Sequence, residues 1–375
     1  MNILGLHGWK GGNNIIGWVH DAGASLFVDG SHVSSIAEER LTRIKADGEY
    51  PHNSIQYVLK EGGIETEEVD VVCYTKNMHT YGSRYMEVLG FLREEFPSAT
   101  VLILDHHLAH AAASFYTSPF NKASIYTQDG GGNMSNSIVG ASNTGTYSLG
   151  TKEAGIELIR DFVDYSDKER GRLFNLGQIY NFVSCIVLES IGALKEGEDI
   201  NHPEFLEQSA GKVMGLAAYG NHRNISVPNI FQVEYDGFQF PIVWADSKGT
   251  VLQKLQEGEP SGGWAPEDLA AWIQHQYKRV LLEYFGELGT KRKHLCMGGG
   301  CALNVLTNRA LIDEGIFEDV HVFPGTSDSG LAFGSAIHGA VIKGETLKLP
   351  SNLAFLGREY TNVEIEEAIY ETFKM

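Results

Sequence analysis

The feature that most constrains the fold of this chain is a pattern that occurs twice. A strand–turn–strand–turn–strand unit begins near residue 2 and again near residue 123. The first copy has apolar segments separated by turns, at 3–7, 24–28 and 33–37. The second copy has strands at 124–127, at 137–140 and from Tyr147 onward, with a glycine-rich turn at 129–133. Because an internal repeat fixes the number of structural units, the sequence predicts two copies of one sheet-forming unit.

Both copies continue into strands that alternate with helices, which is typical of α/β proteins. After the first copy we expect helices at 53–61 and 85–95 and strands at 69–74 and 101–104. After the second we expect helices from Pro266, at 302–312 and at 331–342, and strands at 295–297 and 320–323. The fold class predicted is therefore α/β with a duplicated ASKHA (actin, heat-shock chaperone and sugar kinase) architecture, two βββαβα subdomains around a central cleft. Chance similarity between two hairpins is the alternative.

The repeat also suggests how the chain is divided. We expect a first subdomain at 1–120 and a second at 121–350. The second would carry an insertion at about 150–265, which includes a predicted hairpin at 231–244. This insertion is interpreted as a substrate-facing elaboration, although a solvated insert without a binding role is equally compatible with its mixed polarity.

Charge and composition exclude several classes of function. The chain has 29 Lys and Arg against 48 Asp and Glu, a net charge of −19, so it lacks the basic footprint of a nucleic-acid-binding protein. Its longest apolar runs are too short for a membrane span, so neither nucleic acid nor membrane is an expected partner. The four cysteines show neither paired spacing nor disulfide density. We therefore expect a cytoplasmic protein.

A histidine-rich segment follows the predicted strand at 101–104. Asp105 is a natural N-cap, and His106 and His110 lie four residues apart on one helical face, where two imidazoles can reach one metal ion. Position 107 is His and not Glu, so the segment is not a zinc-protease motif. Asp129 and Asp328 lie in loops after two other predicted strands and are candidates to complete a site for a divalent metal. Histidines that merely pack a helix end are the alternative interpretation.

Glycine-rich loops follow two of the predicted strands. The runs at 130–132 and 298–300 would let backbone amides approach a phosphate, and the second opens directly into a helix. No phosphate-loop motif is present, and each run alone is more typical of a tight turn. His20 and Asp21 precede the second strand, where a histidine beside an acid can carry a proton. For Asp21 a turn-capping role is equally expected.

Six motifs in order then identify a family. They are His20–Leu26, Glu38–Lys45, Asp105–Ala112, Lys212–Gly220, Gly298–Asn304 and Asp328–Gly334. Together they closely resemble the O-carbamoyltransferases of nodulation-factor and antibiotic biosynthesis. They are also similar to the tRNA threonylcarbamoyl-transfer enzymes, which share the HxxxH metal motif.

The resemblance implies transfer of a carbamoyl group from carbamoyl adenylate, made from carbamoyl phosphate and ATP, to the hydroxyl of a small-molecule acceptor, with release of AMP. It implies a metal, typically iron, held by His106, His110, Asp129 and Asp328. His20 and Asp129 would act at the transfer centre. The residues implied to bind the nucleotide or carbamoyl adenylate are Gly131, Gly132, Asn133, Gly299, Gly300 and Asn304.

One departure from the family pattern concerns the C-terminus. Residues 351–375 resemble the start of a connection to a C-terminal YrdC-like domain that would form the adenylate. We therefore expect a separate YrdC-like partner to supply carbamoyl adenylate. The alternatives are a different activated donor, a non-catalytic nucleotide-sensing subunit of the same fold, a tRNA-modifying transferase, or a small-molecule kinase recognised by its ADP product.

Overall fold

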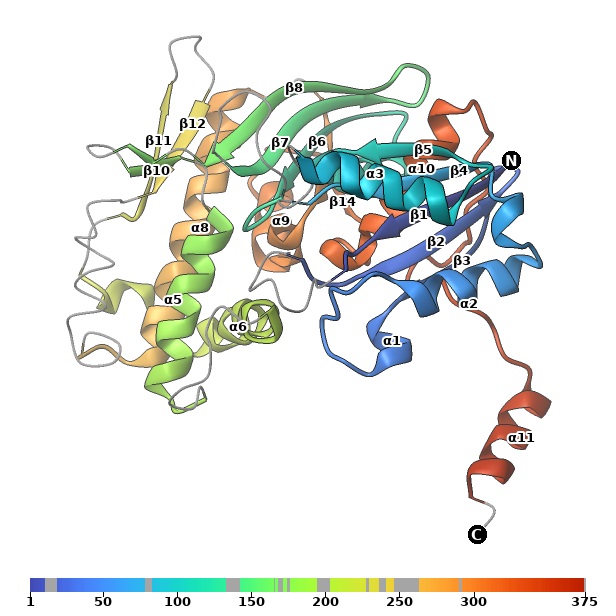
Figure 1. Ribbon diagram of the computed structural model, residues 1–375. Coiled ribbons are helices and arrows are strands. Elements are labelled where there is room, and N and C mark those ends of the chain that lie inside the picture. Colours follow the sequence, from blue (N-terminus) through green and yellow to red (C-terminus); the bar gives the residue numbers. More distant parts are fainter. Residues whose placement is uncertain are drawn as a thin grey trace.

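The fold contains two five-stranded sheets that repeat one topology (Figure 1). The computed structural model describes residues 1–10, 19–77, 83–132, 142–164, 166–167, 171–173, 176–193, 203–226, 229–235, 241–245, 263–289 and 292–373. The first sheet has the order β3-β2-β1-β4-β5. The second has the order β8-β7-β6-β13-β14. In both sheets the order is therefore the third, second and first strand of the unit, followed by two strands that join through crossover connections.

Strand directions are also repeated. In each sheet the first three strands pair antiparallel and the last two join in parallel. The strands of the first sheet are β1 (Asn2–His7), β2 (Gly23–Val28), β3 (Ser31–Ala37), β4 (Val71–Thr75) and β5 (Thr100–Leu104). Those of the second are β6 (Lys122–Gln128), β7 (Ser142–Thr151), β8 (Gly155–Asp164), β13 (His294–Gly298) and β14 (Asp319–Val322). The predicted duplicated ASKHA fold class is confirmed.

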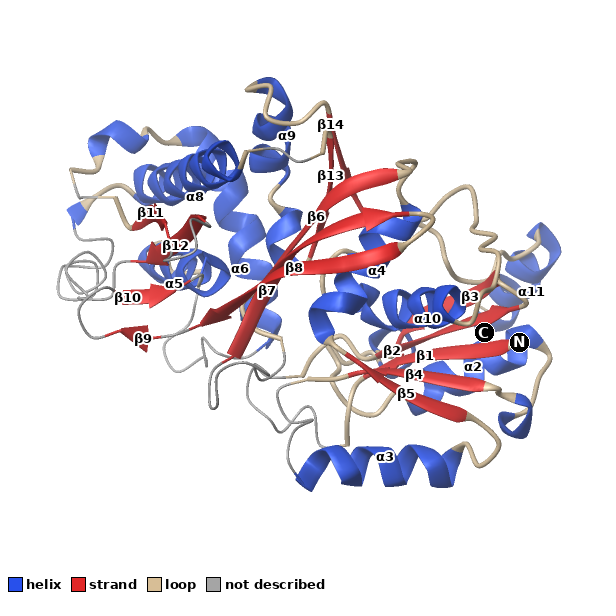
Figure 2. Cartoon of the chain, turned by 90° about the horizontal axis from the view of Figure 1, so that it is seen from above, coloured by secondary structure: helices blue, strands red, loops and turns tan. Residues whose placement is uncertain are grey.

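Two helices separate the sheets, and each belongs by sequence to the opposite unit. Helix α4 (His106–Thr117) follows β5 of the first sheet but packs against β6 and β13 of the second. Helix α10 (Leu331–Ile342) follows β14 of the second sheet but packs against β1, β2 and β4 of the first. The two helices also pack against each other, so the central layers run sheet, α10, α4, sheet (Figure 2).

Glycines allow these central layers to approach closely. A Cβ on Gly334 of α10 would lie 2.1 Å from the carbonyl oxygen of Ala109 in α4. A Cβ on Gly5 of β1 would lie 2.1 Å from the carbonyl oxygen of Ala332. Since backbone cannot yield as a side-chain tip can, any larger residue at either position would force the layers apart.

Other helices cover the outer faces of the sheets. On the first sheet, α2 (His52–Gly62) and α3 (Ser83–Glu95) bury Ile55, Val58 and Leu92 against the strands. On the second sheet, a larger core includes α5 (Leu176–Ser190), α8 (Pro266–Leu288) and α9 (Val305–Asp313). The other helical elements are α1 (Glu39–Thr42), α6 (Pro203–Leu216), α11 (Asn362–Thr372) and the short 3-10 turns Thr66–Glu68, Ala217–Tyr219, His222–Asn224, Gly300–Leu303 and Asp328–Gly330.

The 150–265 segment contributes to the second sheet before it departs from it. Strand β8 lies inside this segment and pairs with β7 along its length. A third sheet follows, with the order β11-β12-β10-β9. Its strands are β9 (Ser166–Asp167), β10 (Gly171–Leu173), β11 (Phe231–Tyr235) and β12 (Pro241–Ala245). The antiparallel pairing of β11 with β12 confirms the predicted hairpin.

One strand prediction was wrong in position, and one lies outside the described residues. The sequence predicts Tyr147 in the third strand of the second copy. It belongs instead to the second strand, β7, where it lies directly opposite Tyr126 of β6, and the third strand is β8. The predicted strand at 137–140 falls outside the described residues.

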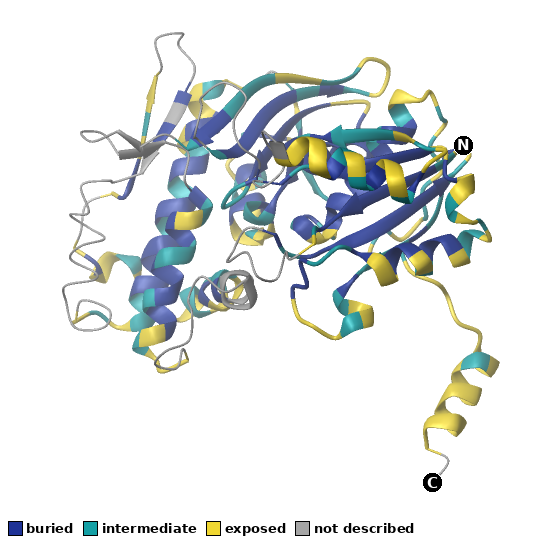
Figure 3. Cartoon of the chain, in the orientation of Figure 1, coloured by how far each residue is buried: buried dark blue, intermediate teal, exposed yellow. Residues whose placement is uncertain are grey.

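Helix α11 stands apart from the rest of the chain and contains no buried residue (Figure 3). Within the described ranges, none of the helices combines the length and apolar character that a bilayer span requires.

Candidate metal centre

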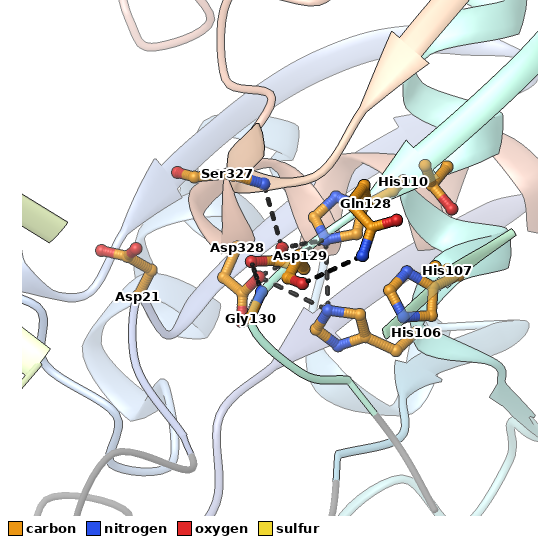
Figure 4. Close-up of polar contacts among 12 residues, drawn as sticks. Asp21, His106, His107, His110, Gln128, Asp129, Gly130, Ser327 and Asp328 are labelled. Atoms are coloured by element: carbon orange, nitrogen blue, oxygen red, sulfur yellow. Dashed lines mark hydrogen bonds and ion pairs between the residues drawn. The ribbon is translucent and has the colours of Figure 1, made fainter. Parts of the chain in front are cut away.

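Four side chains converge where strands of both sheets end (Figure 4). His106 and His110 lie one turn apart at the start of α4, which begins directly after β5 and its N-cap Asp105. Asp129 follows the last residue of β6, and Asp328 follows β14 at the start of a 3-10 turn. The carboxyl ends of parallel strands meet at one edge of a sheet, and this topology brings the four residues together.

The distances among the four side chains fit a single metal ion. His106 Nε2 lies 3.1 Å from His110 Nε2 and 3.5 Å from Asp328 Oδ1. His110 Nε2 lies 3.3 Å from Asp129 Oδ2 and 3.4 Å from Asp328 Oδ1. Two ligands bound at about 2.1 Å to one ion lie about 3.0 Å apart at right angles and about 3.4 Å apart in a tetrahedral site. The observed separations therefore match ligands that share one ion, and all four donor atoms lie within 4.8 Å of one another.

Charge at the cluster also favours a cation. The pKa values of Asp129 and Asp328 lie below the ordinary value, because the nearby histidines outweigh the effect of burial, which raises them. Burial lowers the pKa of His110, but the hydrogen bonds and charges of Asp129 and Asp328 outweigh it and raise this pKa to about 9. The two carboxylates, one buried and one partly buried, thus favour the charged form of His110. A divalent ion bound by two neutral imidazoles would balance the two negative charges instead. The donor set suits a first-row divalent metal.

Neighbouring groups orient the ligands. The Asp105 carboxylate accepts from the His107 backbone amide and so caps α4. The amides of Gly130 and Gly300 donate to the two oxygens of Asp129, at 2.8 Å and 3.0 Å. These bonds fix the Asp129 carboxylate between the two glycine-rich loops, as outer-shell hydrogen bonds do at metal sites.

Two further buried histidines lie beside the cluster, and the sequence did not predict a role for either of them. The His107 ring is buried and donates through Nε2 to the Asn143 carbonyl at 3.1 Å. His7, at the end of β1, lies 3.9 Å through Nε2 from Asp328 Oδ2 and donates through the same nitrogen to the His20 carbonyl at 3.1 Å. Burial lowers the pKa of each to about 4, so both are neutral at physiological pH. The sequence does place His7 as a polar residue at the end of an apolar strand, and this pattern could have indicated a functional position.

His20 lies at the edge of the cluster. Its Nε2 is 3.7 Å from Asp328 Oδ2, and its Nδ1 is 3.2 Å from Asp21 Oδ2. Its side chain is 24% exposed, whereas those of His106 and His110 are almost fully buried. His20 therefore lies between the His106, His110, Asp129 and Asp328 cluster and the exterior, where a substrate group can reach it.

The predicted nucleotide-binding residues occupy different environments. Gly132 is buried, and a Cβ there would lie 2.7 Å from His107 Nε2. Gly299 has φ +83, and its Cβ would lie 2.4 Å from the Gln128 carbonyl oxygen, so only glycine fits. Gly131 is partly exposed, and Asn133 falls outside the described residues.

Asn304 is engaged within the protein. Its side chain caps α9 by accepting from the Thr307 amide, and it exchanges two hydrogen bonds with Gln274 of α8, at 2.9 Å and 3.0 Å. Gln274 was not singled out in the sequence, because a glutamine inside an amphipathic helix carries no motif signal. In this arrangement Asn304 fixes the loop after β13.

Known proteins resemble this chain in sequence over most of its length. The sequence profile described as "Carbamoyltransferase N-terminus" matches residues 14–89 and 77–337. The chain is 28% identical over 410 residues to an uncharacterized protein of Synechocystis sp., covering 94% of this chain and 61% of that protein. It is 27% identical over 350 residues to nodulation protein NolNO of Sinorhizobium fredii, covering 85% of this chain and 46% of that protein. The chain thus spans about half the length of the relatives it matches.

Among solved structures, full-length HypF in its phosphate- and nucleotide-bound form superposes with a TM-score of 0.49 and 12% identity, covering 94% of this chain and 47% of HypF. Component A of the Acidaminococcus fermentans (R)-2-hydroxyglutaryl-CoA dehydratase superposes with a TM-score of 0.46 and 15% identity, covering 90% of this chain and 97% of that one. The sequence profile spans most of the chain and includes all four residues of the cluster. This chain belongs to the carbamoyltransferase N-terminal domain family.

Proposed function

We propose that this chain transfers a carbamoyl group from carbamoyl adenylate to the hydroxyl of a small natural-product acceptor, with release of AMP. Family membership supports the reaction class. The observation that carries the proposal is the convergence of His106, His110, Asp129 and Asp328 within reach of one ion, beside the partly exposed His20.

The proposed roles follow from this placement. The four-residue cluster would hold a divalent metal, for which we propose iron, and the bound metal would stabilise negative charge on the leaving phosphate. His20 would take the proton of the acceptor hydroxyl through Nε2, which faces the cluster. The glycine loops at 130–132 and 299–300 would line the nucleotide, while the amide of Gly300 keeps Asp129 in place.

We propose that a separate YrdC-like protein forms the carbamoyl adenylate from carbamoyl phosphate and ATP. The experiment combines the chain with such a protein, carbamoyl phosphate, ATP and a divalent metal. Release of AMP without an acceptor, by hydrolysis of the carbamoyl adenylate, measures use of the donor. Mass spectrometry of a panel of hydroxylated small molecules detects carbamoylation. AMP release is expected to require both proteins and the metal.

Two variants make the experiment decisive. His110→Ala is expected to abolish AMP release, whereas His52→Ala, which changes an exposed histidine of α2, should not alter it. Equal rates for wild type and His110→Ala would refute the proposal. ADP in place of AMP would identify a kinase, and unchanged partner binding with no turnover in wild type would identify a regulatory subunit.

A further inference from the structure

We propose that Asp21 is a positioning residue for His20, an inference that rests on the proposed function. Asp21 Oδ2 lies 3.2 Å from His20 Nδ1, and Asp21 is 5% exposed. On the other side of the ring, His20 Nε2 lies 3.7 Å from Asp328 Oδ2. The imidazole is therefore held between a buried carboxylate and the metal cluster, and Figure 4 shows Asp21 outside that cluster.

The backbone at Asp21 makes this contact possible. Successive side chains of an extended segment point to opposite sides, so neighbours such as His20 and Asp21 cannot normally meet. Asp21 has φ 57, in the left-handed region, and this reversal turns its carboxylate back toward the preceding ring. A left-handed non-glycine residue costs about 1 kcal/mol or more, and such strain persists where the surroundings enforce it.

Hydrogen bonds on both sides hold the strained residue. The His20 carbonyl accepts from His7 Nε2 at 3.1 Å. The Ala22 amide donates to the Asp47 carbonyl at 2.7 Å, and the Ala22 carbonyl accepts from the Glu38 amide at 2.8 Å. Because both neighbours of Asp21 are fixed, its side chain is directed at His20 by the fold itself.

The contact selects one tautomer of His20. An ionised carboxylate only accepts hydrogen bonds, so Nδ1, which lies 3.2 Å from Asp21 Oδ2, carries the proton. Asp328 Oδ2, at 3.7 Å, is beyond hydrogen-bond distance of Nε2, which keeps its lone pair for the acceptor hydroxyl. In the transfer step, Nε2 takes the proton of the acceptor hydroxyl as its oxygen bonds to the carbamoyl carbon. The bond from that carbon to the phosphate oxygen breaks, and AMP leaves with both electrons. Asp21 stabilises the resulting imidazolium without taking the proton.

The kinetic test uses Asp21→Gly and Asp21→Asn, because both residues tolerate a left-handed backbone. Both variants are expected to lower the kcat of AMP release from carbamoyl adenylate at least about 100-fold, with the KM for carbamoyl adenylate changed less than about threefold. The asparagine amide can donate to Nδ1 and so selects the wrong tautomer. Formate should restore part of the activity of Asp21→Gly, which has space for it, and none of that of Asp21→Asn.

The matched control is Asp29→Gly, which changes another left-handed aspartate, at φ 49, in an exposed turn away from His20. It should leave kcat unchanged. A kcat for Asp21→Gly within about threefold of wild type, or a loss that formate does not restore, would overturn the inference.

A second readout does not depend on turnover. Nitrogen-15 NMR of histidine-labelled protein at about pH 8.5 reports the tautomer of His20, with His20→Gln assigning its signals. We expect a protonated Nδ1 in wild type and loss of that preference in Asp21→Gly. An unchanged tautomer overturns the role of Asp21 whatever the activity. Absence of carbamoyl transfer with the expected tautomer change would overturn only the proposed function.

Discussion

The contact between α4 and α10 makes a sharp prediction for Gly334→Ala. The new Cβ would lie 2.1 Å from the Ala109 carbonyl oxygen, whereas Cβ contacts below 3.0 Å essentially do not occur, so the helices must separate by at least 3.0 − 2.1 = 0.9 Å. Alanine gains about 1 kcal/mol of helix propensity over glycine. Overpacking costs about 1–3 kcal/mol and more where only backbone can move, so we expect a net loss of about 1–2 kcal/mol.

The same displacement should also move His106 and His110 of the candidate metal site, because Ala109 lies between them on α4. Metal ligands tolerate errors of about 0.2 Å, so metal affinity should fall at least about tenfold. Denaturant unfolding and calorimetric metal titration measure the two effects. The control, Gly90→Ala in α3, has open space around its Cβ and should gain about 0.5–1 kcal/mol. The reasoning would be refuted if Gly334→Ala were as stable as Gly90→Ala and bound the metal as tightly as the wild type.

Three other perturbations test different features. Asp328→Asn removes a charge from the metal cluster and should weaken zinc or ferrous ion binding by about 100-fold in calorimetric titration; unchanged affinity would exclude it as a ligand. Burial lowers the pKa of His32 to about 4, so the unfolded chain takes up its proton first as pH falls, and about 2.5 kcal/mol of stability should be lost between pH 7.5 and 4.5. The unfolding free energy of His32→Gln should fall less over this range, and parallel curves would contradict the prediction. Glu38 accepts four hydrogen bonds from two residues at the start of α2, so Glu38→Gln should cost about 2–3 kcal/mol in denaturant unfolding, against less than about 0.5 for the exposed Glu67→Gln.

The sequence was informative where local chemistry and topology agree. The repeated apolar strands predicted both sheets, and α10 begins and ends where its pattern indicated. The four metal-ligand candidates could be named because each follows a strand, and strand ends of this fold class meet. The distances among these side chains confirm that they converge.

Other features depend on contacts that a linear pattern does not encode. Strand β7 is almost entirely buried and rich in glycine, serine and threonine, so it lacks the alternation that marks a half-exposed strand. Helix α4 is buried on nearly all sides, so its sequence does not indicate which sheet it covers. The left-handed conformation of Asp21 lies beside Ala22, whose amide donates to the Asp47 carbonyl and whose carbonyl accepts from the Glu38 amide, and these contacts are distant in sequence.

The exchange of α4 and α10 between the two units has a consequence for how the protein unfolds. A chain cut after residue 120 would leave the first sheet without the helix that covers its inner face, and α4 without the sheet it packs on. Neither half can then bury its core alone. The two repeats should unfold in one cooperative transition, and amides of β1 and β13 should exchange with solvent at the same free energy of opening. The sequence repeat thus marks two copies of a pattern within a single folding unit.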